Sequence, residues 1–401
     1  MKNKPELLSP VSDFTSLTAS IKSGCNAIYF GVKELNMRIT ANNFTLNELK
    51  KVVDICHKNK VKAYLTLNTI IYNNELNKIK KILKTAKKAK IDAIICWDFS
   101  VIQEVKKLKL PFHISTQASV SNIESAKFYK NLGAERIILA RELSLEQIKE
   151  IKKKSNIQVE CFIHGAMCVA LSGRCFTSQF VFGRSANRGD CLQPCRRNYI
   201  VKDKRIGYEL GLENDAVLSP KDLCTLPFIE KLIEAGIDAF KIEGRARSPD
   251  YVSVVTRVYR KAIDAYFENK LTNNFKQALI SELKTVYNRD FSSGFYLGKP
   301  INEFTSPDNQ AIRKKVLIGI VKNYYKNINV AEIKLLTKDL KINDLIMIQG
   351  PTTGVIEQKV NSIEINDKKV DIAKKGAIIG IKFDNIVRKN DKVFLINKLF
   401  K

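Results

Sequence analysis

Histidine is scarce in this sequence, with only three among 401 residues, at His57, His113 and His164. No His-Glu-x-x-His pair is present, and no Gly-x-Ser-x-Gly motif follows a strand-like segment. These motifs supply the metal ligands of many zinc peptidases and the nucleophile of many serine hydrolases. A peptide hydrolase built from this chain would therefore need another nucleophile and base, such as a pair formed by Cys168 and His164.

Long apolar segments are also absent. No run approaches the roughly 18 apolar residues that a membrane helix needs, and residues 1–10 lack the apolar core of a signal peptide. The nine cysteines are odd in number, which argues against a disulfide framework. We therefore expect a cytoplasmic protein without a membrane partner, whose reduced thiols are available for binding a metal.

Acidic residues are few relative to basic ones. The chain has 68 Lys or Arg residues against 41 Asp or Glu, and its formal net charge is +27. Such an excess favours a polyanionic partner such as RNA, because complementary charge raises both affinity and association rate. A lysine-rich composition explains the excess equally well, so the charge favours RNA without identifying it.

The sequence alternates between short apolar segments and amphipathic helical segments. Apolar segments separated by helices predict strands of a parallel sheet that is covered on both faces. Eight such units in about 250 residues predict a closed (β/α)8 barrel of the TIM type. The alternative is an open doubly wound sheet, but no Gly-x-Gly-x-x-Gly follows the first strand. The predicted strands are residues 6–10, 27–32, 62–68, 92–98, 111–117, 136–141, 159–165 and 238–244.

The predicted domain division follows from where this alternation stops. Residues 1–300 are expected to form the barrel domain, with a Cys-rich insertion from about 166 to 237 between strands 7 and 8. A linker is predicted at 301–312, where no apolar periodicity occurs. Residues 313–401 contain short strand-like runs and turns without helices, which predicts a small antiparallel β-barrel.

Four cysteines in the insertion form a candidate ligand set. Cys168, Cys175, Cys191 and Cys195 are separated by 6, 15 and 3 residues. Four thiolates satisfy either a tetrahedral zinc ion or an iron-sulfur cluster. Only Cys191 and Cys195 have the close spacing of a zinc knuckle, so the irregular spacing favours a cluster, while zinc or free thiols remain alternatives.

The segment Glu160 to Ser178 reads E-x-F-x-x-G-A-M-C-x4-G-x-C-x-x-S, which resembles the pattern of the U-32, collagenase-like peptidase family. Thr177 departs from it, because the family pattern prefers an aliphatic residue there. The resemblance extends over about residues 6–300 through further segments, and the C-terminal region resembles an elongation-factor-like β-barrel. These further segments are STQASVSN (115–122), ILARELS (138–144), SPKDL (219–223), KIEGR (241–245), YRKAID (259–264) and NRDFSSGFYLG (288–298).

The resemblance implies one of two activities. Some members of the family are named proteases, and others hydroxylate tRNA, ribosomal RNA or a quinone precursor without oxygen by means of a four-iron four-sulfur (4Fe-4S) cluster. The tRNA branch implies hydroxylation of the wobble uridine at C5, with the dicarboxylate prephenate as hydroxyl donor. The basic charge argues against a quinone substrate. A non-catalytic protein that binds RNA or the ribosome is the third alternative.

Site residues are expected where the barrel strands end, because the chemistry of such barrels sits at their C-terminal face. Arginines there suit the carboxylates of a donor, since a guanidinium binds a carboxylate with two parallel hydrogen bonds. His164 and Glu243 are the candidates for proton transfer, although His164 could instead tune a cluster and Glu243 could pair with a neighbouring cation. The predicted substrate-binding residues are Arg38, Asn68, Gln117, Arg141, Lys241 and Arg245.

Overall fold

The computed structural model describes residues 3–207, 209–210, 216–301, 303–305 and 308–399. Eight parallel strands close into a barrel, because β11 pairs with both β1 and β7 while the other strands pair in sequence order. The predicted barrel is thus confirmed, and each predicted strand overlaps an observed one. The strands are β1 (Glu6–Pro10), β2 (Ala27–Phe30), β3 (Lys62–Leu67), β4 (Ala93–Cys96), β5 (Phe112–Ile114), β6 (Arg136–Ile138), β7 (Gln158–Gly165) and β11 (Ala239–Ile242).

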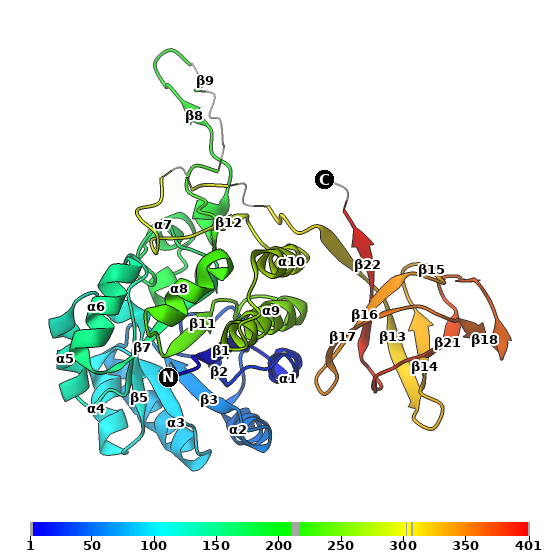
Figure 1. Ribbon diagram of the computed structural model, residues 1–401, viewed down its shortest axis with the longest axis horizontal. Helices are drawn as coiled ribbons and strands as arrows, with labels where there is room; N and C mark the ends of the chain where they lie inside the picture. Colours follow the sequence, from blue (N-terminus) through cyan, green and yellow to red (C-terminus); the bar gives the residue numbers. More distant parts are fainter. Residues whose placement is uncertain (1–2, 208, 211–215, 302, 306–307, 400–401) are drawn as a thin grey trace.

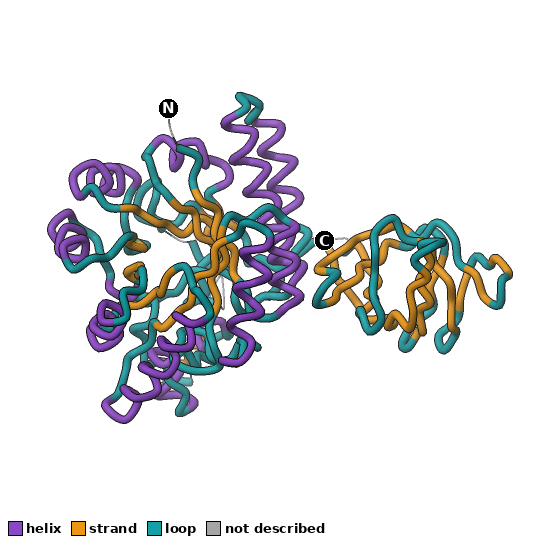
Figure 2. The backbone as a smooth tube through the Cα atoms, turned by 90° about the horizontal axis from the view of Figure 1, so that it is seen from below, coloured by secondary structure: helices purple, strands orange, loops and turns teal. Residues whose placement is uncertain are grey.

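Helices surround the barrel and cover the outer faces of its strands (Figure 2). Several of them start at a side chain that accepts a hydrogen bond from an otherwise unpaired backbone N–H group; Asp13 and Ser144 do so in capping boxes. The buried strands carry mostly apolar side chains, which form one continuous core with the inner faces of the helices. The helices are α1 (Phe14–Lys22), α2 (Leu49–Lys58), α3 (Leu76–Lys88), α4 (Phe99–Lys107), α5 (Ile123–Asn131), α6 (Leu145–Ser155), α8 (Ile229–Glu234), α9 (Pro249–Phe267) and α10 (Asn273–Leu283).

The chain between β7 and β11 contains the four candidate ligands. It runs through irregular turns to the short helix α7 (Thr177–Phe182) and then to a hairpin of β8 (Val201–Lys202) and β9 (Glu209–Leu210), which projects from the barrel (Figure 1). The segment returns through β10 (Asp222–Cys224), which runs antiparallel to β7 and also pairs with β12 (Phe291–Ser292). The seventh strand is therefore flanked by β10 as well as by its barrel neighbours.

The C-terminal region forms an antiparallel sheet with a separate apolar core. The sheet order is β17-β16-β22-β13-β14-β21-β18-β19, and within the described residues no pairing joins β17 to β19. The prediction of a closed barrel is therefore wrong, whereas the likeness to an elongation factor stays a prediction. The strands are β13 (Arg313–Tyr325), β14 (Val330–Leu335), β16 (Leu345–Gly350), β17 (Gly354–Lys359), β18 (Glu364–Ile365), β19 (Lys368–Lys369), β21 (Ile378–Lys382) and β22 (Lys392–Lys398), and β15 (Leu340–Lys341) pairs separately with β20 (Ile372–Ala373).

The curvature of the sheet has a physical cause in β13. This strand is 13 residues long and shifts register against both neighbours, so it bends and pairs with β22 along one half and with β14 along the other. The sheet curls around its core without its edge strands meeting. Polar contacts join it to the barrel: Thr18 Oγ1 donates to the Pro351 carbonyl at 2.6 Å, and Gln349 Nε2 donates to Asp250 at 3.1 Å.

None of the helices in the described part of the chain is both long enough and apolar enough to cross a membrane.

Candidate functional site

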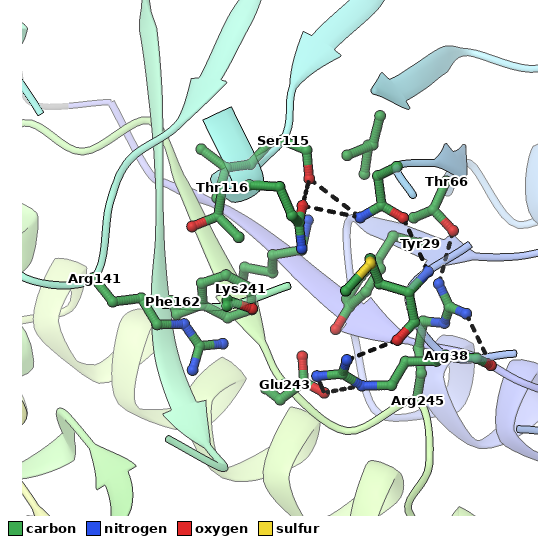
Figure 3. Close-up of a pocket in the computed structure, with 16 residues that line it drawn as sticks. Tyr29, Arg38, Thr66, Ser115, Thr116, Arg141, Phe162, Lys241, Glu243 and Arg245 are labelled. Carbon is green, nitrogen blue, oxygen red and sulfur yellow. Dashed lines mark hydrogen bonds and ion pairs between the residues drawn. The ribbon is translucent and has the colours of Figure 1, made fainter. Parts of the chain in front are cut away.

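A pocket opens at the C-terminal ends of the barrel strands, and we call it the mouth pocket. Its lining includes every residue predicted to bind substrate, together with Glu243 (Figure 3). These residues come from five different strands or the loops that follow them, so barrel closure is what brings them together. The lining residues are Tyr29, Met37, Arg38, Thr66, Asn68, Ile95, Ser115, Thr116, Gln117, Ile138, Arg141, Phe162, Ser172, Lys241, Glu243 and Arg245.

Arg38 and Glu243 form an ion pair across the mouth pocket. Arg38 Nε and Nη2 both donate to Glu243 Oε1, at 3.1 and 2.9 Å. The Glu243 carboxylate raises the pKa of Arg38. Burial acts to raise the pKa of Glu243, but the guanidinium groups of Arg38 and Arg141 outweigh it and hold that pKa below its ordinary value. Glu243 is therefore ionised at neutral pH, and among the described residues its Oε2 receives no hydrogen bond.

Arg245 is a buried cation that makes no ion pair within the described residues. Its side chain is held by Thr66 Oγ1 at 2.7 Å, by Asn43 Oδ1 at 3.1 Å and by Asn36 Oδ1. Burial lowers the pKa of Arg245 to about 10, which still leaves the group charged at neutral pH. Its Nε has no hydrogen-bond partner. A buried, unpaired guanidinium at a pocket wall favours an anionic ligand.

Arg141 supplies a third guanidinium from the opposite side of the mouth pocket. Its Nη1 donates to the Ala166 carbonyl at 2.8 Å, and its guanidinium lies 3.8 Å from the centre of the Phe162 ring. Its buried Nε has no partner. Arg38, Arg141 and Arg245 together face the single carboxylate of Glu243, so the pocket carries an excess of positive charge.

Lys241 does not add to this excess. Its ammonium lies 2.7 Å from Glu160 and 4.2 Å from the centre of the Tyr29 ring. Burial lowers the pKa of Lys241, and the Glu160 carboxylate opposes that effect. Glu160 also contacts Arg136, which pairs with Glu6, so Lys241 is one end of a buried ionic network inside the barrel.

Asn68 and Gln117 form a neutral polar wall. Asn68 Nδ2 donates to Gln117 Oε1 and to Ser115 Oγ, both at 3.2 Å, while its Oδ1 accepts from the Met37 N–H at 3.3 Å. These contacts fix both amides in orientation and leave the Gln117 side-chain N–H groups available to a ligand. Asp98, another polar residue at a strand end, instead caps α4.

His164 is not among the residues that line the mouth pocket, and its role in proton transfer stays a prediction. Its ring is buried among Tyr251, Tyr259 and Phe291, and Nδ1 lies 3.4 Å from the Tyr259 hydroxyl. Strict alternation would place His164 on the same face as Phe162, which lines the pocket, but the register irregularity between β7 and β11 at Lys241 and Ile242 breaks the alternation before His164. Burial lowers the pKa of His164 to about 4, so the ring is neutral at pH 7.

This burial predicts a measurable pH dependence of stability. The unfolded chain protonates His164 near its ordinary pKa of 6.5, while the folded protein does so only near 4. Lowering the pH through this window therefore favours unfolding, by about 3 kcal/mol from this residue at pH 4. Urea unfolding of wild type and His164→Gln at pH 7 and pH 4.5 measures it. We expect the wild type to lose more stability than the variant, and equal losses would contradict the assignment.

The four candidate cysteines line one hollow beside the mouth pocket, which we call the cysteine hollow. Its volume is about 110 Å³, and Arg38, Arg196 and Arg289 also line it. Burial raises the pKa of Cys191 and of Cys195, and Cys168 and Cys175 raise both further, as expected for groups that face one another.

The donor set of the cysteine hollow consists of thiols. Within the described residues, no three His, Cys, Asp or Glu side chains lie close enough to hold a single metal ion. A cluster of several irons stands between its thiolates and holds them further apart than one zinc ion does. Four thiols that line one hollow are the donor set that a cluster or a zinc ion requires.

Polar groups of the surrounding loops lie within hydrogen-bond distance of two of the cysteine sulfur atoms. The Gln193 N–H donates to Cys191 Sγ at 3.3 Å, and Thr177 Oγ1 lies 3.2 Å from Cys175 Sγ. Gly189 has φ +85°, and a Cβ there would lie 2.2 Å from the Asn36 carbonyl, so only glycine lets this loop approach the barrel rim. The close approach makes Arg38 a wall of both the mouth pocket and the cysteine hollow.

Several residues of the mouth pocket were missed at the level of sequence. Tyr29, Thr66 and Phe162 lie within strands and face inward, and Ser115 follows β5. The twofold alternation of side chains along each strand is the signal for such residues, but it identifies them only once the inward face of each strand is known.

Comparisons with known proteins agree over most of the chain. The family model described as peptidase family U32 matches residues 12–306. The chain is 45% identical to an uncharacterized protease of Methanocaldococcus jannaschii, covering 98% of each chain. It is 41% identical to a collagenase of Porphyromonas gingivalis, covering 99% of each, and 36% identical to tRNA hydroxylation protein P1 of Bacillus subtilis, covering 90% of this chain and 86% of that protein.

Proposed function

The chain belongs to peptidase family U32, and from this membership and the mouth pocket we propose that it is an enzyme that hydroxylates RNA. The proposed substrate is tRNA, modified at C5 of the wobble uridine. The proposed co-substrate is the dicarboxylate prephenate, as source of the hydroxyl group. Relatives named for tRNA hydroxylation support the reaction class.

The observation that carries the proposal is the charge of the mouth pocket. Three guanidinium groups face one carboxylate in a partly buried space, and two of them have an unpaired Nε. A small ligand with two carboxylates would satisfy these donors with charge-assisted hydrogen bonds. Arg141 and Arg245 lie on opposite sides of Glu243 and would hold such a ligand in one orientation (Figure 3).

The residues of the pocket also provide for proton transfer. Glu243 is ionised, its Oε1 is held by Arg38, and its Oε2 can accept a proton from a bound reactant. Cys168, Cys175, Cys191 and Cys195 would hold the proposed 4Fe-4S cluster, which would supply electron transfer next to the pocket. Arg38 would then position Glu243 while facing the thiolates.

The peptidase alternative lacks a catalytic pair in this arrangement. None of the three histidines lines the mouth pocket. His57 pairs with Asp92 near the surface, His113 is buried against Tyr64, and His164 is buried among aromatic rings. A thiol nucleophile at Cys168 would therefore have no imidazole base beside it.

The function is tested by producing the protein in a bacterial strain that lacks its own RNA-hydroxylating relatives. Nucleosides from purified tRNA and ribosomal RNA are then measured by mass spectrometry. We expect hydroxylated uridine in tRNA, and hydroxylated nucleosides only in ribosomal RNA would reassign the substrate. Bound but unmodified RNA would support a non-catalytic role, and peptide cleavage without RNA modification would restore the peptidase alternative.

Arg141→Lys tests the assigned donor site. Lysine keeps the charge but loses the paired N–H groups and the planar contact with Phe162, so we expect prephenate to bind about 10- to 100-fold more weakly. Isothermal titration calorimetry measures this directly. Arg257→Lys is the matched control, because Arg257 pairs with Glu282 outside the pocket. Unchanged affinity in Arg141→Lys would remove Arg141 from the site.

A further inference from the structure

A group of exposed apolar side chains lies on α7 and at the residue before it, next to the cysteine hollow. Phe180 is 84% exposed, Phe176 is 60% exposed and Val181 is 57% exposed, and we call these three residues the aromatic ridge. The rings of Phe176 and Phe180 lie 5.9 Å apart, tilted by 36°. Exposed apolar groups gathered on one short element mark a contact surface, because leaving them in water is unfavourable.

The aromatic ridge is held in place by the loops that carry the candidate ligands. Phe176 directly follows Cys175, and the Leu192 N–H donates to Ser178 Oγ at 3.0 Å, which ties α7 to the loop after Cys191. In Figure 1, α7 lies at the same end of the barrel as the β8–β9 hairpin. A ligand on the ridge would therefore lie beside the opening to the cysteine hollow.

The charge near the aromatic ridge identifies the kind of partner. The Arg197 guanidinium lies 4.5 Å from the centre of the Phe182 ring, at the end of α7, and makes no ion pair with any described residue. Lys204 and Arg205 in the turn of the hairpin are exposed, and the described residues offer them no acidic partner either. Aromatic side chains beside unpaired cations match the bases and phosphates of a single-stranded nucleic acid.

We propose that the aromatic ridge stacks on unpaired bases next to the nucleotide that is modified. This inference rests on the proposed RNA substrate and adds to it how the RNA is held. Base stacking tolerates sequence changes, because every base has an aromatic face, so the ridge would set loop geometry while the mouth pocket selects the target. A base-paired stem cannot use the ridge, since its bases are already stacked on each other.

Binding measurements on anaerobically purified full-length protein test this. Fluorescence anisotropy would compare Phe180→Ala, Phe180→Leu, Phe180→Trp and the wild type on a labelled anticodon stem-loop and on a duplex of equal length. We expect Phe180→Ala and Phe180→Leu to weaken stem-loop binding by about 5- to 150-fold and Phe180→Trp to retain it. Phe128→Ala is the control, since Phe128 is 55% exposed on α5.

The outcomes separate the inference from the proposed function. Wild-type affinity in Phe180→Leu would overturn stacking, because leucine keeps an apolar contact but has no aromatic face on which a base can stack. Equal losses on stem-loop and duplex, or none in Phe180→Ala, would also overturn it. A wild type that binds the stem-loop through Phe180 without hydroxylating it would support the ridge and reject the enzymatic proposal.

Discussion

Cys191→Ser is expected to abolish RNA hydroxylation and to remove most of the iron and sulfide from the anaerobically purified protein. Cys191 lines the cysteine hollow with the three other candidate ligands. A serine hydroxyl is a poor ligand for iron at neutral pH, because it remains protonated where a coordinated thiol is deprotonated. The absorption spectrum and iron and sulfide assays measure the metal, and nucleoside analysis measures the reaction.

The matched control for this change is Cys56→Ala. Cys56 is buried in α2 within the apolar core of the barrel, far along the chain from the candidate ligands. We expect its removal to lower stability while leaving iron content and modification as in the wild type. A colourless wild type, or a Cys191→Ser variant that retains its iron, would contradict the cluster assignment.

The barrel was predictable from the sequence because its signal is local and repeated. Eight apolar segments separated by amphipathic helices leave few arrangements that bury every strand on both faces. The mouth pocket followed from the same prediction, since parallel strands carry their C-terminal ends to one face. Arg38, Asn68 and Arg245 are far apart in the chain, yet all line that pocket.

Properties that depend on side-chain direction and sheet closure were less predictable. His164 lies near the end of β7 as expected, but its ring packs outward against Tyr259, and a single sequence does not reveal the register irregularity that breaks the side-chain alternation there. Closure of the C-terminal sheet depends on pairing between distant edge strands. The register shifts that bend β13 against both of its neighbours are likewise not revealed by a single sequence.

The ionic network inside the barrel predicts the largest effect on stability. Glu160 is fully buried and contacts both Lys241 and Arg136, which are themselves 4% exposed. Glu160→Ala would leave buried positive charges without this carboxylate, although Arg136 would keep its contact with Glu6. Breaking a buried pair in this way is expected to lower the free energy of unfolding by about 3–5 kcal/mol. Urea unfolding at pH 7 measures the loss, and a change below about 1 kcal/mol would contradict the network's role.

A double variant separates this structural role from a role in substrate binding. Glu160→Met with Lys241→Met removes both charges of the shorter pair and fills the space with apolar atoms, so it is expected to recover most of the lost stability. Lys241 also lines the mouth pocket. If its only task is to pair with Glu160, the double variant hydroxylates RNA at the wild-type rate. If the folded double variant is inactive, Lys241 also contacts the substrate, because its removal then affects catalysis while the barrel remains intact.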